Sequence, residues 1–469
     1  MSGIRYRIVS KYIGTVFLVM AAVFAVTAAC AVVYGEKGAL YFFLPASIAS
    51  AAIGVFLIKR VPEKDVADAE AAAVAALSFL TASIIGAVPF VFLTGSPLID
   101  AWFEAMSGVT TTGFSLLTVD TAPRSVVFYR ALLQWIGGLG FIIITAAVFL
   151  VSGRPAVTLL KDAIEEKVFA RITKNIRTVA LTYFVFTLAG IILLLIFGIK
   201  VFDAVSLAMA GISTGGFAPV SDISVLYSPW QVFFPLIVIM FLGSTNFMAY
   251  YKELKEQKTL KDALRAVATN PQFLTLTFTM TIAGIVFAVI YDGPHEAVEG
   301  IFLAVSAHST TGFTLSPVTA FPEPVLMLAI VLMFVGGSVG STAGGIKISR
   351  AIDVFKGLKR FALSTIYPRE MVSAGDEGKK DGLSAAIYVI TLYTCAVIVS
   401  AVIFVMSGYG PLLSVFEVVS AASTVGLSGG IVSPELASPL KLILIFLMWG
   451  GRLEFIALMI WGAAIIARR

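Results

Sequence analysis

The sequence predicts an all-α integral membrane protein with an N-terminal helical hairpin followed by four pseudo-repeats of one helical unit. Three observations predict this class. Hydrophobic residues make up 59% of the 469 residues and charged residues only 13%, whereas a soluble globular domain has roughly 25% charged residues. Apolar runs of about 20 residues, the length that crosses a bilayer, recur along the chain. A short polar loop appears four times between such runs.

The first apolar run predicts a retained helix. It extends from Tyr12 to Tyr34, which is longer than the roughly 7–15 residues of a signal-peptide core, and it lacks a clear small-residue cleavage site. With the next run it forms the N-terminal hairpin. The segments long and apolar enough to be predicted as spanning helices are 10–34, 40–58, 68–95, 124–152, 176–200, 227–251, 271–292, 323–358, 383–408 and 438–467.

Four further apolar runs are too short to span a membrane. They are residues 98–109, 201–212, 296–308 and 411–422, and such runs are typical of re-entrant half-helices. Each is followed by a polar loop, so the repeating unit is outer helix, half-helix, polar loop and inner helix. The predicted divisions are the two-helix hairpin at 1–64 and four repeats at 65–152, 153–265, 266–365 and 366–469, the third with a broken inner helix.

The four loops read TTTGF at 110–114, STGGF at 213–217, STTGF at 309–313 and STVGL at 423–427. Non-helical backbone at membrane depth is tolerated only where it is buried in protein or lines an aqueous path. Four equivalent loops can converge on one central pore, where carbonyl and hydroxyl oxygens replace the water shell of an ion. Glycine permits the left-handed backbone that turns successive carbonyls inward, and neutral oxygens suit a monovalent cation.

The loops are therefore predicted to form a selectivity filter that binds a monovalent cation. The predicted filter residues are Thr110, Thr111, Thr112, Gly113, Ser213, Thr214, Gly215, Gly216, Ser309, Thr310, Thr311, Gly312, Ser423, Thr424, Val425 and Gly426. The alternative is that Thr/Gly steps are helix-packing notches. Four such steps in register, each between a half-helix and a spanning helix, favour the filter.

Charge placement predicts the topology. Most of the 33 Lys and Arg residues lie in segments 1–11, 59–64, 153–178, 252–265 and 347–380. The positive-inside rule places these segments and both termini in the cytoplasm. Topology explains these basic loops, so nucleic acid is not an expected partner. No spanning segment carries a paired catalytic constellation, so an enzyme is not expected, and no cofactor is expected in this chain.

With these motifs the chain resembles the Trk/Ktr/HKT superfamily of potassium transporters, and most closely its TrkH branch, over essentially its whole length. The resemblance rests on the four loops, the added N-terminal hairpin, GGSVGSTAGGIK at 336–347 and GRLE at 451–454. It implies potassium as the transported ion, with the four glycines marking potassium selectivity. Gly113 stands where serine is associated with sodium transport in the family.

The resemblance also implies partners and a place in the cell. Members form homodimers in the cytoplasmic (inner) membrane, surrounded by membrane lipid. They dock a cytoplasmic ring of nucleotide-binding regulatory subunits of the TrkA type, and no such regulatory domain is present in this sequence.

A run of glycine, serine and threonine predicts a break in the third inner helix, because these residues do not hold a straight helix in the middle of a span. The resemblance makes this run the family's intramembrane loop, which lies under the filter and acts as a gate. A passive packing kink is the alternative. The predicted gate residues are Gly336, Gly337, Gly340, Ser341, Thr342, Gly344, Gly345 and Arg452.

Arg452 joins the predicted gate because of its place in the repeat. The motifs WIGGLGF at 135–141, FLGSTNF at 241–247 and WGGRLEF at 449–455 align Gly138, Ser244 and Arg452, and spacing adds Gly337. An arginine at that depth costs about 2.5–3.5 kcal/mol, so we expect it to project into the cavity below the filter, against 336–345. The alternative is a structural arginine capped by loop carbonyls.

Two classes of function remain open. The first is potassium uptake through a channel-like pore. The second is an alternating-access cation symporter coupled to protons or sodium, although the repeats of such transporters are usually two and often inverted. Four repeats of one orientation favour the pore.

Three further side chains lie near the predicted filter. His308 is either a proton sensor or, as we favour, a satisfied histidine behind the filter. Glu104 and Glu417 align on their half-helices. They either support the filter by hydrogen bonds or add negative potential at the mouth.

Overall fold

The structure is a computed structural model that describes residues 4–60, 66–152, 161–247, 250, 260–290, 294–366 and 377–466. Every regular element within these residues is a helix, which confirms the predicted all-α class. Parts of the predicted basic segments 1–11, 59–64, 153–178, 252–265 and 347–380 lie outside the described residues, as do the predicted divisions at 64 and 153.

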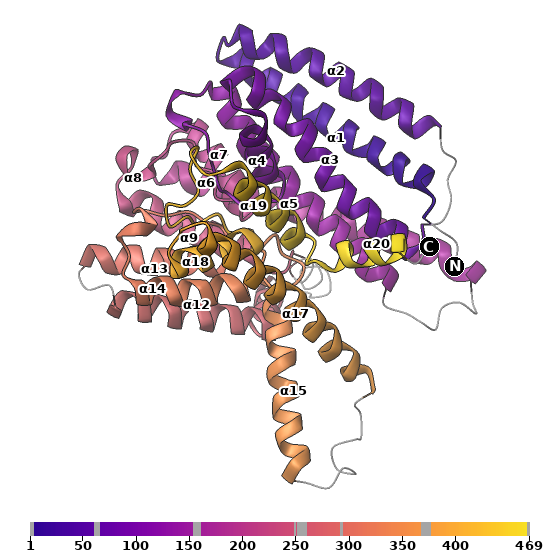
Figure 1. The fold of residues 1–469 in the computed structure, drawn as a ribbon, viewed down its shortest axis with the longest axis vertical. Helices are drawn as coiled ribbons and strands as arrows, with labels where there is room; N and C mark the ends of the chain where they lie inside the picture. The colour runs from indigo at the N-terminus through magenta and orange to yellow at the C-terminus, as the bar shows by residue number, and fades with distance from the viewer. Residues whose placement is uncertain are drawn as a thin grey trace.

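The N-terminal segment is a pair of antiparallel helices. Helices α1 (Tyr6–Val33) and α2 (Lys37–Lys59) are joined by a turn at Gly35, whose φ of 68° favours glycine. Gly14 and Gly54 let the two helices touch, because a Cβ at Gly14 would lie 2.9 Å from the carbonyl oxygen of Gly54. Both helices lie beside α3 (Asp68–Thr94) at the top of Figure 1.

Four units of long helix, short helix and inner helix follow the hairpin. The first contains α3, α4 (Leu98–Val109) and α5 (Arg124–Ser152), and the second α6 (Lys161–Ile196), α7 (Val201–Ile212) and α9 (Pro229–Ser244). The third contains α12 (Pro271–Ile290), α13 (Pro294–His308) and α14 (Glu323–Val335), and the fourth α17 (Glu377–Met406), α18 (Pro411–Ala422) and α19 (Ser438–Arg452). Short elements connect them: α8 (Ile223–Leu226), α11 (Leu260–Ala268) and 3₁₀ turns at Val119–Thr121 and Val318–Ala320.

The short helices α4, α7, α13 and α18 form the centre of the molecule. Three of them bury a phenylalanine completely, ten residues before the loop glycine: Phe103, Phe302 and Phe416. Prolines mark the starts of several elements, since the first or second helical position in α9, α14, α18 and α19 is a proline. A proline there loses no helical hydrogen bond, because its missing N–H would have had no partner within the helix.

The inner helix of the first unit, α5, has the predicted bounds 124–152, whereas the other three inner helices are shorter than the sequence predicts. Among the described residues, seven helices are long and apolar enough to cross a membrane, and the bent pair α19 and α20 (Ile456–Ile466) would add an eighth span. The continuous helices predicted at 227–251 and 438–467 are not found: α9 ends at Ser244, and the chain turns by 99° between α19 and α20. The span predicted at 323–358 is interrupted between α14 and α15 (Ile348–Ile366).

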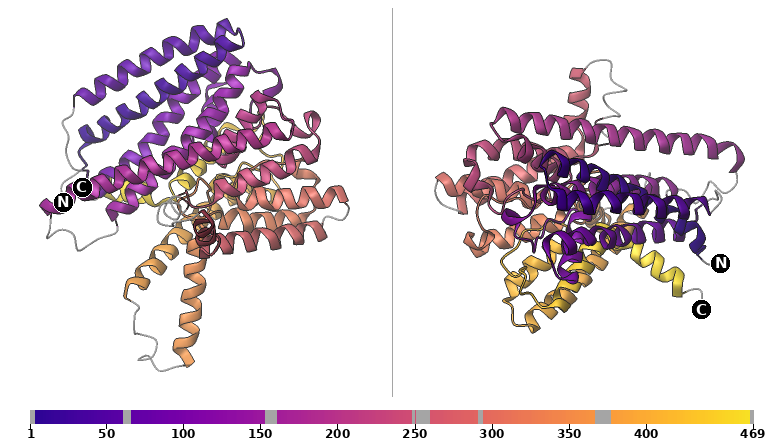
Figure 2. Two further views of the ribbon diagram at one scale, coloured as in Figure 1. Left: turned by 180° about the vertical axis from the view of Figure 1, so that it is seen from behind. Right: turned by 90° about the horizontal axis from the view of Figure 1, so that it is seen from above.

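Helix α15 and the beginning of α17 project from the body of the molecule as a hairpin, while the rest of α17 packs in the bundle (Figure 1). Helix α15 follows directly on segment 336–347 and exposes Lys356 and Lys359. At another point of the bundle, Ile4 and Val9 pack with Trp461 and Ala464 of α20. The described chain therefore begins and ends at the same end of the bundle (Figure 2).

Candidate functional site: a ring of four polar loops

Each short helix ends in the same hydrogen-bond pattern. In the first loop, the N–H of Thr111 donates to the Gly108 carbonyl at 3.0 Å and that of Thr112 to the Ser107 carbonyl at 2.8 Å. The other three loops repeat both bonds at the corresponding positions. This is the Schellman motif, which ends a helix by placing one residue in the left-handed conformation.

The residue placed in that conformation is a threonine in every loop. Thr111, Thr214, Thr310 and Thr424 have φ values of 55°, 51°, 56° and 52°. A β-branched residue is a genuine outlier there, and such strain persists only where the surrounding structure holds it. Our sequence reasoning expected left-handed backbone at glycine and missed these threonines. The available signal was that the second loop position is threonine in all four loops.

The four loops meet in a closed ring. Gly113, Gly216, Gly312 and Gly426 have φ values between 80° and 100°. A Cβ on Gly113 would overlap the carbonyl oxygen of Gly215. In the same way, a Cβ on Gly216 would overlap the carbonyl oxygen of Thr311, one on Gly312 that of Val425, and one on Gly426 that of Thr112. Each glycine thus faces the third residue of the next loop, and the fourth loop returns to the first. The structure brings all four predicted loops together.

Hydroxyl groups brace three of the loops. The Thr110 and Thr112 hydroxyls lie 2.8 Å apart, as do those of Ser309 and Thr311. The Ser423 hydroxyl lies 2.5 Å from the phenol oxygen of Tyr393. These bonds fix Thr112 and Thr311, whose backbone carbonyls belong to the ring, and Ser423 at the start of the fourth loop.

Glu104 and Glu417 hold the segments that follow the first and fourth loops. Glu104 accepts hydrogen bonds from the Ser115 hydroxyl at 3.0 Å and the Leu116 N–H at 2.9 Å. Glu417 accepts from the Ser428 hydroxyl at 2.6 Å and the Ile431 N–H at 3.1 Å. Both side chains are buried, so the geometry favours support by hydrogen bonds over a charge at the mouth.

Arg130 is a buried residue that sequence reasoning missed. Its Nε lies 2.7 Å from Glu104 Oε1 and its Nη2 2.8 Å from the Ser115 hydroxyl oxygen. Its guanidinium also covers the ring of Phe217 at 4.0 Å, just after the second loop. One α5 side chain therefore joins the segments after two loops.

His308 lies behind the third loop. It is buried, and its Nε2 lies 2.6 Å from the Thr279 hydroxyl oxygen on α12. The Nδ1 atom is buried without a hydrogen-bond partner among the described residues, so the histidine lies behind the filter as expected but is satisfied at one ring nitrogen only.

Segment 336–347 lies directly against the loops. The Gly344 N–H donates to Thr310 Oγ1 at 2.6 Å, and a Cβ on Gly344 would overlap the Ser423 carbonyl. Thr342 Oγ1 donates to the Ile212 and Gly243 carbonyls at 2.9 and 2.8 Å. The segment thus contacts the loops or inner helices of the second, third and fourth units.

Two inner helices, α5 and α9, also contact this segment. The Ser338 N–H donates to the Ser244 carbonyl at 3.0 Å, at the end of α9. A Cβ on Gly138 of α5 would lie 3.1 Å from a side-chain carbon of Thr342. The aligned positions Gly138, Ser244 and Arg452 therefore lie against the segment, which itself contains the fourth aligned position, Gly337.

Arg452 contacts the predicted gate segment. Its Nη1 donates to the Thr342 carbonyl at 2.7 Å, and its guanidinium lies 4.1 Å from the centre of the Phe141 ring. The side chain is 1% exposed. The predicted contact with 336–345 and the alternative of a loop-carbonyl cap are thus present together. Glu454 pairs with Arg350 of α15 instead.

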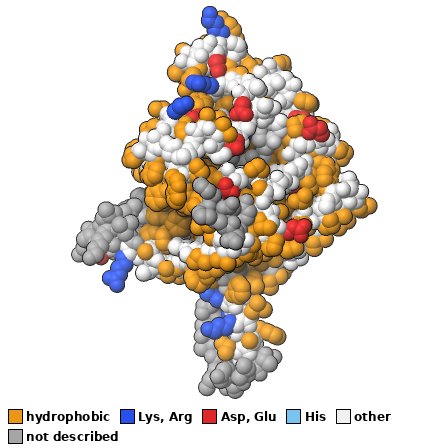
Figure 3. All heavy atoms as spheres, turned by 90° about the vertical axis from the view of Figure 1, so that its left-hand side faces the viewer, with side chains coloured by type: hydrophobic (Ala, Val, Ile, Leu, Met, Phe, Trp, Pro, Cys, Tyr) orange, Lys and Arg blue, Asp and Glu red, His pale blue; other side chains and the backbone are white. Residues whose placement is uncertain are grey.

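Exposed acidic side chains surround the loop openings. We call the surface formed by segments 114–123, 217–228, 313–322 and 427–437, which follow the four loops, the mouth face. Asp120, Asp222 and Glu435 are exposed on it, and Glu323 is exposed at its border. Figure 3 views the side where α8 lies and shows acidic side chains there. Such a surface attracts cations.

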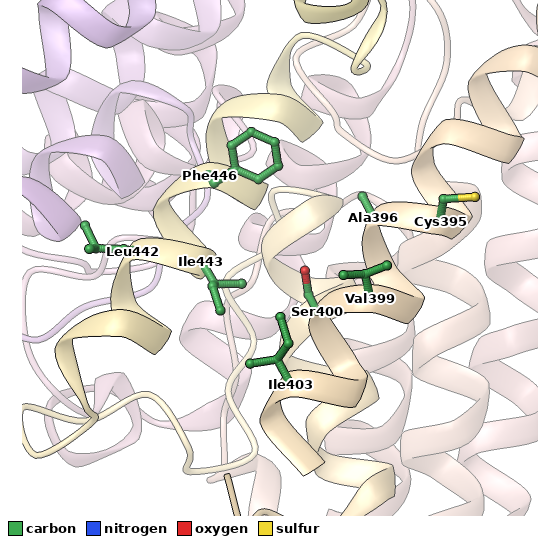
Figure 4. Close-up of a pocket in the computed structure, with 8 residues that line it drawn as sticks. All are labelled: Cys395, Ala396, Val399, Ser400, Ile403, Leu442, Ile443 and Phe446. Atoms are coloured by element: carbon green, nitrogen blue, oxygen red, sulfur yellow. The ribbon is translucent and has the colours of Figure 1, made fainter. Parts of the chain in front are cut away.

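An apolar groove lies away from the loops. It has a volume of about 510 Å³ and is lined by Cys395, Ala396, Val399, Ser400, Ile403, Leu442, Ile443 and Phe446. Side chains of α17 and α19 point into it from two sides (Figure 4). It carries no charged side chain, so its chemistry suits apolar groups rather than a cation.

Comparisons with known proteins identify the family. The model of the TrkH family, described as a cation transport protein, matches residues 69–467. The chain belongs to the TrkH family. An uncharacterized cation transporter of Methanocaldococcus jannaschii is 32% identical over 442 residues, which cover 92% of this chain and 90% of that protein.

Two further comparisons concern proteins named TrkH. The Trk system potassium uptake protein TrkH of Salmonella typhimurium is 28% identical over 97% of this chain and 98% of its own length. The crystal structure of the potassium transporter TrkH from Vibrio parahaemolyticus matches with a TM-score of 0.86 at 21% identity, covering 97% of this chain and 98% of that one. That likeness shows the fold. Family and helices together make this chain a multi-pass membrane protein.

Proposed function

We propose that this TrkH-family protein takes up potassium across the cytoplasmic membrane through a channel-like pore. The observation that carries the proposal is the closed ring of four loops, in which each glycine faces a carbonyl of the next loop. Rings of backbone carbonyls replace the hydration shell of potassium in known channels. The relatives named Trk system potassium uptake proteins support the same ion.

The mouth face would supply cations to this ring. Asp120, Asp222, Glu323 and Glu435 would attract cations to the opening, although Arg124 and Lys200 are also exposed beside them. The ring itself has neutral oxygens, so it coordinates a monovalent ion without a carboxylate.

Segment 336–347 would act as the gate together with Arg452. It lies against the ring through Gly344 and carries the carbonyl that Arg452 binds. A potassium ion leaving the ring would meet both the segment and the arginine charge. Since α15 continues from this segment, a force on the α15–α17 hairpin could move it.

The remaining parts of the proposal concern orientation and assembly. Both termini would be cytoplasmic, which agrees with their common end of the bundle. A homodimer would carry one pore in each subunit. A cytoplasmic nucleotide-binding subunit of the TrkA type would dock on segments 153–178 and 347–380.

Rubidium and potassium uptake into proteoliposomes tests the function. We expect uptake that follows the potassium gradient, prefers potassium to sodium, and needs neither a pH gradient nor a sodium gradient. Uptake that appears only with one of those gradients would support the alternating-access cation symporter instead. Steady single-channel currents in planar bilayers would provide independent support for the pore.

A further inference from the structure

The second loop lacks a side chain that the other loops have. Its third residue is Gly215, whereas the third residues of the other loops are Thr112, Thr311 and Val425. In the first and third loops that threonine hydroxyl lies 2.8 Å from the hydroxyl of the first loop residue. Gly215 cannot form such a bond, so the second loop needs another brace.

Gln134 of α5 occupies the place of the missing side chain. Its Nε2 donates to the Gly215 carbonyl at 2.5 Å, and its Oε1 accepts from the Phe217 N–H at 3.0 Å. A Cβ on Gly215 would lie 2.6 Å from that Oε1 and 2.8 Å from that Nε2. Gln134 is fully buried. Its amide and a side chain at position 215 therefore exclude each other.

The same amide holds both neighbours of Gly216. It binds the carbonyl before this glycine and the N–H after it, while Gly216 itself has a φ of 80°. The bound Gly215 carbonyl is also the one that Gly113 faces. One side chain from the first unit thus fixes the second loop at its contact with the first.

The corresponding positions in the other units carry no such amide. Gln134 precedes Gly138 by four residues, and the residues four positions before Ser244, Gly337 and Arg452 are Met240, Met333 and Met448. All three methionines are fully buried. The one polar side chain in this aligned position therefore contacts the one loop that has glycine as its third residue.

We propose that Gln134 is a positioning residue of the filter, which sets the Gly215 carbonyl for potassium and so determines selectivity. The proposal rests on the function proposed above. An amide that fixes a carbonyl oxygen and an N–H two residues apart limits how far the loop can adjust to a smaller ion. Without it, the carbonyl can move toward sodium.

Paired substitutions test the proposal. Gln134→Met leaves the carbonyl without its donor, and Gly215→Thr forces a side chain onto the amide. The double variant Gln134→Met/Gly215→Thr reproduces the methionine of position 240 together with the third loop's STTG sequence. Met333→Leu, a change of similar volume at an aligned position, is the matched control.

We expect each single variant to lower the potassium-over-sodium ratio of uptake about tenfold, because a buried polar group loses its partner or is displaced. The potassium-over-sodium ratio of the double variant should recover to within about threefold of the wild-type ratio, because the two substitutions remove each other's defect. The control Met333→Leu should have the wild-type ratio. A double variant whose loss equals the product of the two single losses would overturn the proposal.

A thermal melt of the purified variants separates this proposal from the proposed function. If the wild type shows no preference for potassium, the proposed function fails, while the melting temperatures still report whether positions 134 and 215 are coupled. Additive shifts in melting temperature would then overturn the packing argument. If Gly215→Thr does not fold alone, recovery of folding in the double variant supports the coupling. If neither Gly215→Thr nor the double variant folds, the smaller substitutions Gly215→Ala and Gln134→Ala, alone and combined, test the same coupling.

Discussion

Single residues of the ring adopt backbone conformations that most side chains disfavour. Gly113 has a φ of 100°, and threonine holds the left-handed position two residues earlier. Strain of this kind costs roughly 1–3 kcal/mol per residue, and here the Schellman bonds and the next loop hold it. The ring is therefore sensitive to changes of one atom.

Gly113→Ser should reduce selectivity for potassium over sodium. The new Cβ would overlap the Gly215 carbonyl, which displaces one ring oxygen. We expect the ratio of rubidium to sodium uptake to fall by about tenfold or more, the effect of losing about 1.4 kcal/mol of discrimination. Gly140→Ser is a suitable control, since a Cβ on Gly140 meets nothing within 4 Å. An unchanged ratio in Gly113→Ser would remove this glycine from the filter.

Arg452→Ala should raise potassium flux. The substitution removes a buried positive charge, which lowers the electrostatic barrier to potassium. It also removes the hydrogen bond to the Thr342 carbonyl, so segment 336–347 is held less firmly. We expect about a tenfold increase, which corresponds to a barrier lower by about 1.4 kcal/mol, together with weaker control by the regulatory partner.

Arg452→Lys is the control for charge and should stay closer to the wild type. Both variants need normal expression and an intact ring for the comparison. Flux that is unchanged or lower in Arg452→Ala would show that the arginine has a structural role alone.

At the scale of helices, buried polar side chains fix how the short helices meet the inner helices. Glu104 of α4 pairs with Arg130 of α5 at 2.7 Å, and both are nearly inaccessible. Breaking such a pair leaves one uncompensated charge, whereas exposed charges contribute little. The orientation of the first loop therefore depends on this contact between two helices.

Arg130→Met should destabilise the protein by about 3–5 kcal/mol, the usual cost of removing one partner of a buried ion pair. A thermal melt followed by tryptophan fluorescence measures the effect. Glu435→Gln, at an exposed position, should change stability by less than about 0.5 kcal/mol. Equal melting temperatures for Arg130→Met and the wild type would contradict this role.

Segment 336–347 joins the ring of loops to α15, the first helix of the projecting hairpin. We expect a cytoplasmic regulatory subunit to crosslink to Lys356 and Lys359, which are exposed on α15. Replacing both with glutamate should weaken docking, because an acidic partner surface would then be repelled. Crosslinking in native membranes checks this. A partner that crosslinks to neither 153–178 nor 347–380 would contradict it.

At the scale of the whole molecule, one chain closes the ring. The fourth glycine faces the first loop, and Lys441 of α19 donates to Asp100 of α4 at 2.6 Å. The fourth unit is thus tied to the first within the same chain. A second copy of the chain is not needed to complete the ring.

Each subunit should therefore conduct independently. Mixing wild-type chains with Gly113→Ser chains before reconstitution should give single-channel records of two types, one for each kind of pore. Records with intermediate selectivity would show that loops from different chains share one axis, which is contrary to this expectation.

Much of the fold and of the ring could be predicted because it depends on local patterns. Apolar runs predict long helices, runs that are too short predict half-helices, and the polar loops stand out between them. The ends of α9 and α19 were not predicted, because the glycines before them, Gly243 before Ser244 and Gly450–Gly451 before Arg452, also occur within spanning helices. These helices end where segment 336–347 bonds to them, and no local pattern reports that contact.

The sequence by itself determined the membrane class, the four loops and the break at segment 336–347, since composition and repetition are properties of the chain alone. Tertiary structure decided which side chains hold the loops. Glu104 meets Arg130, and Gln134 meets Gly215, across large separations in sequence. Such pairs form because a buried polar group must find a partner, and only the packed helices decide which partner is within reach.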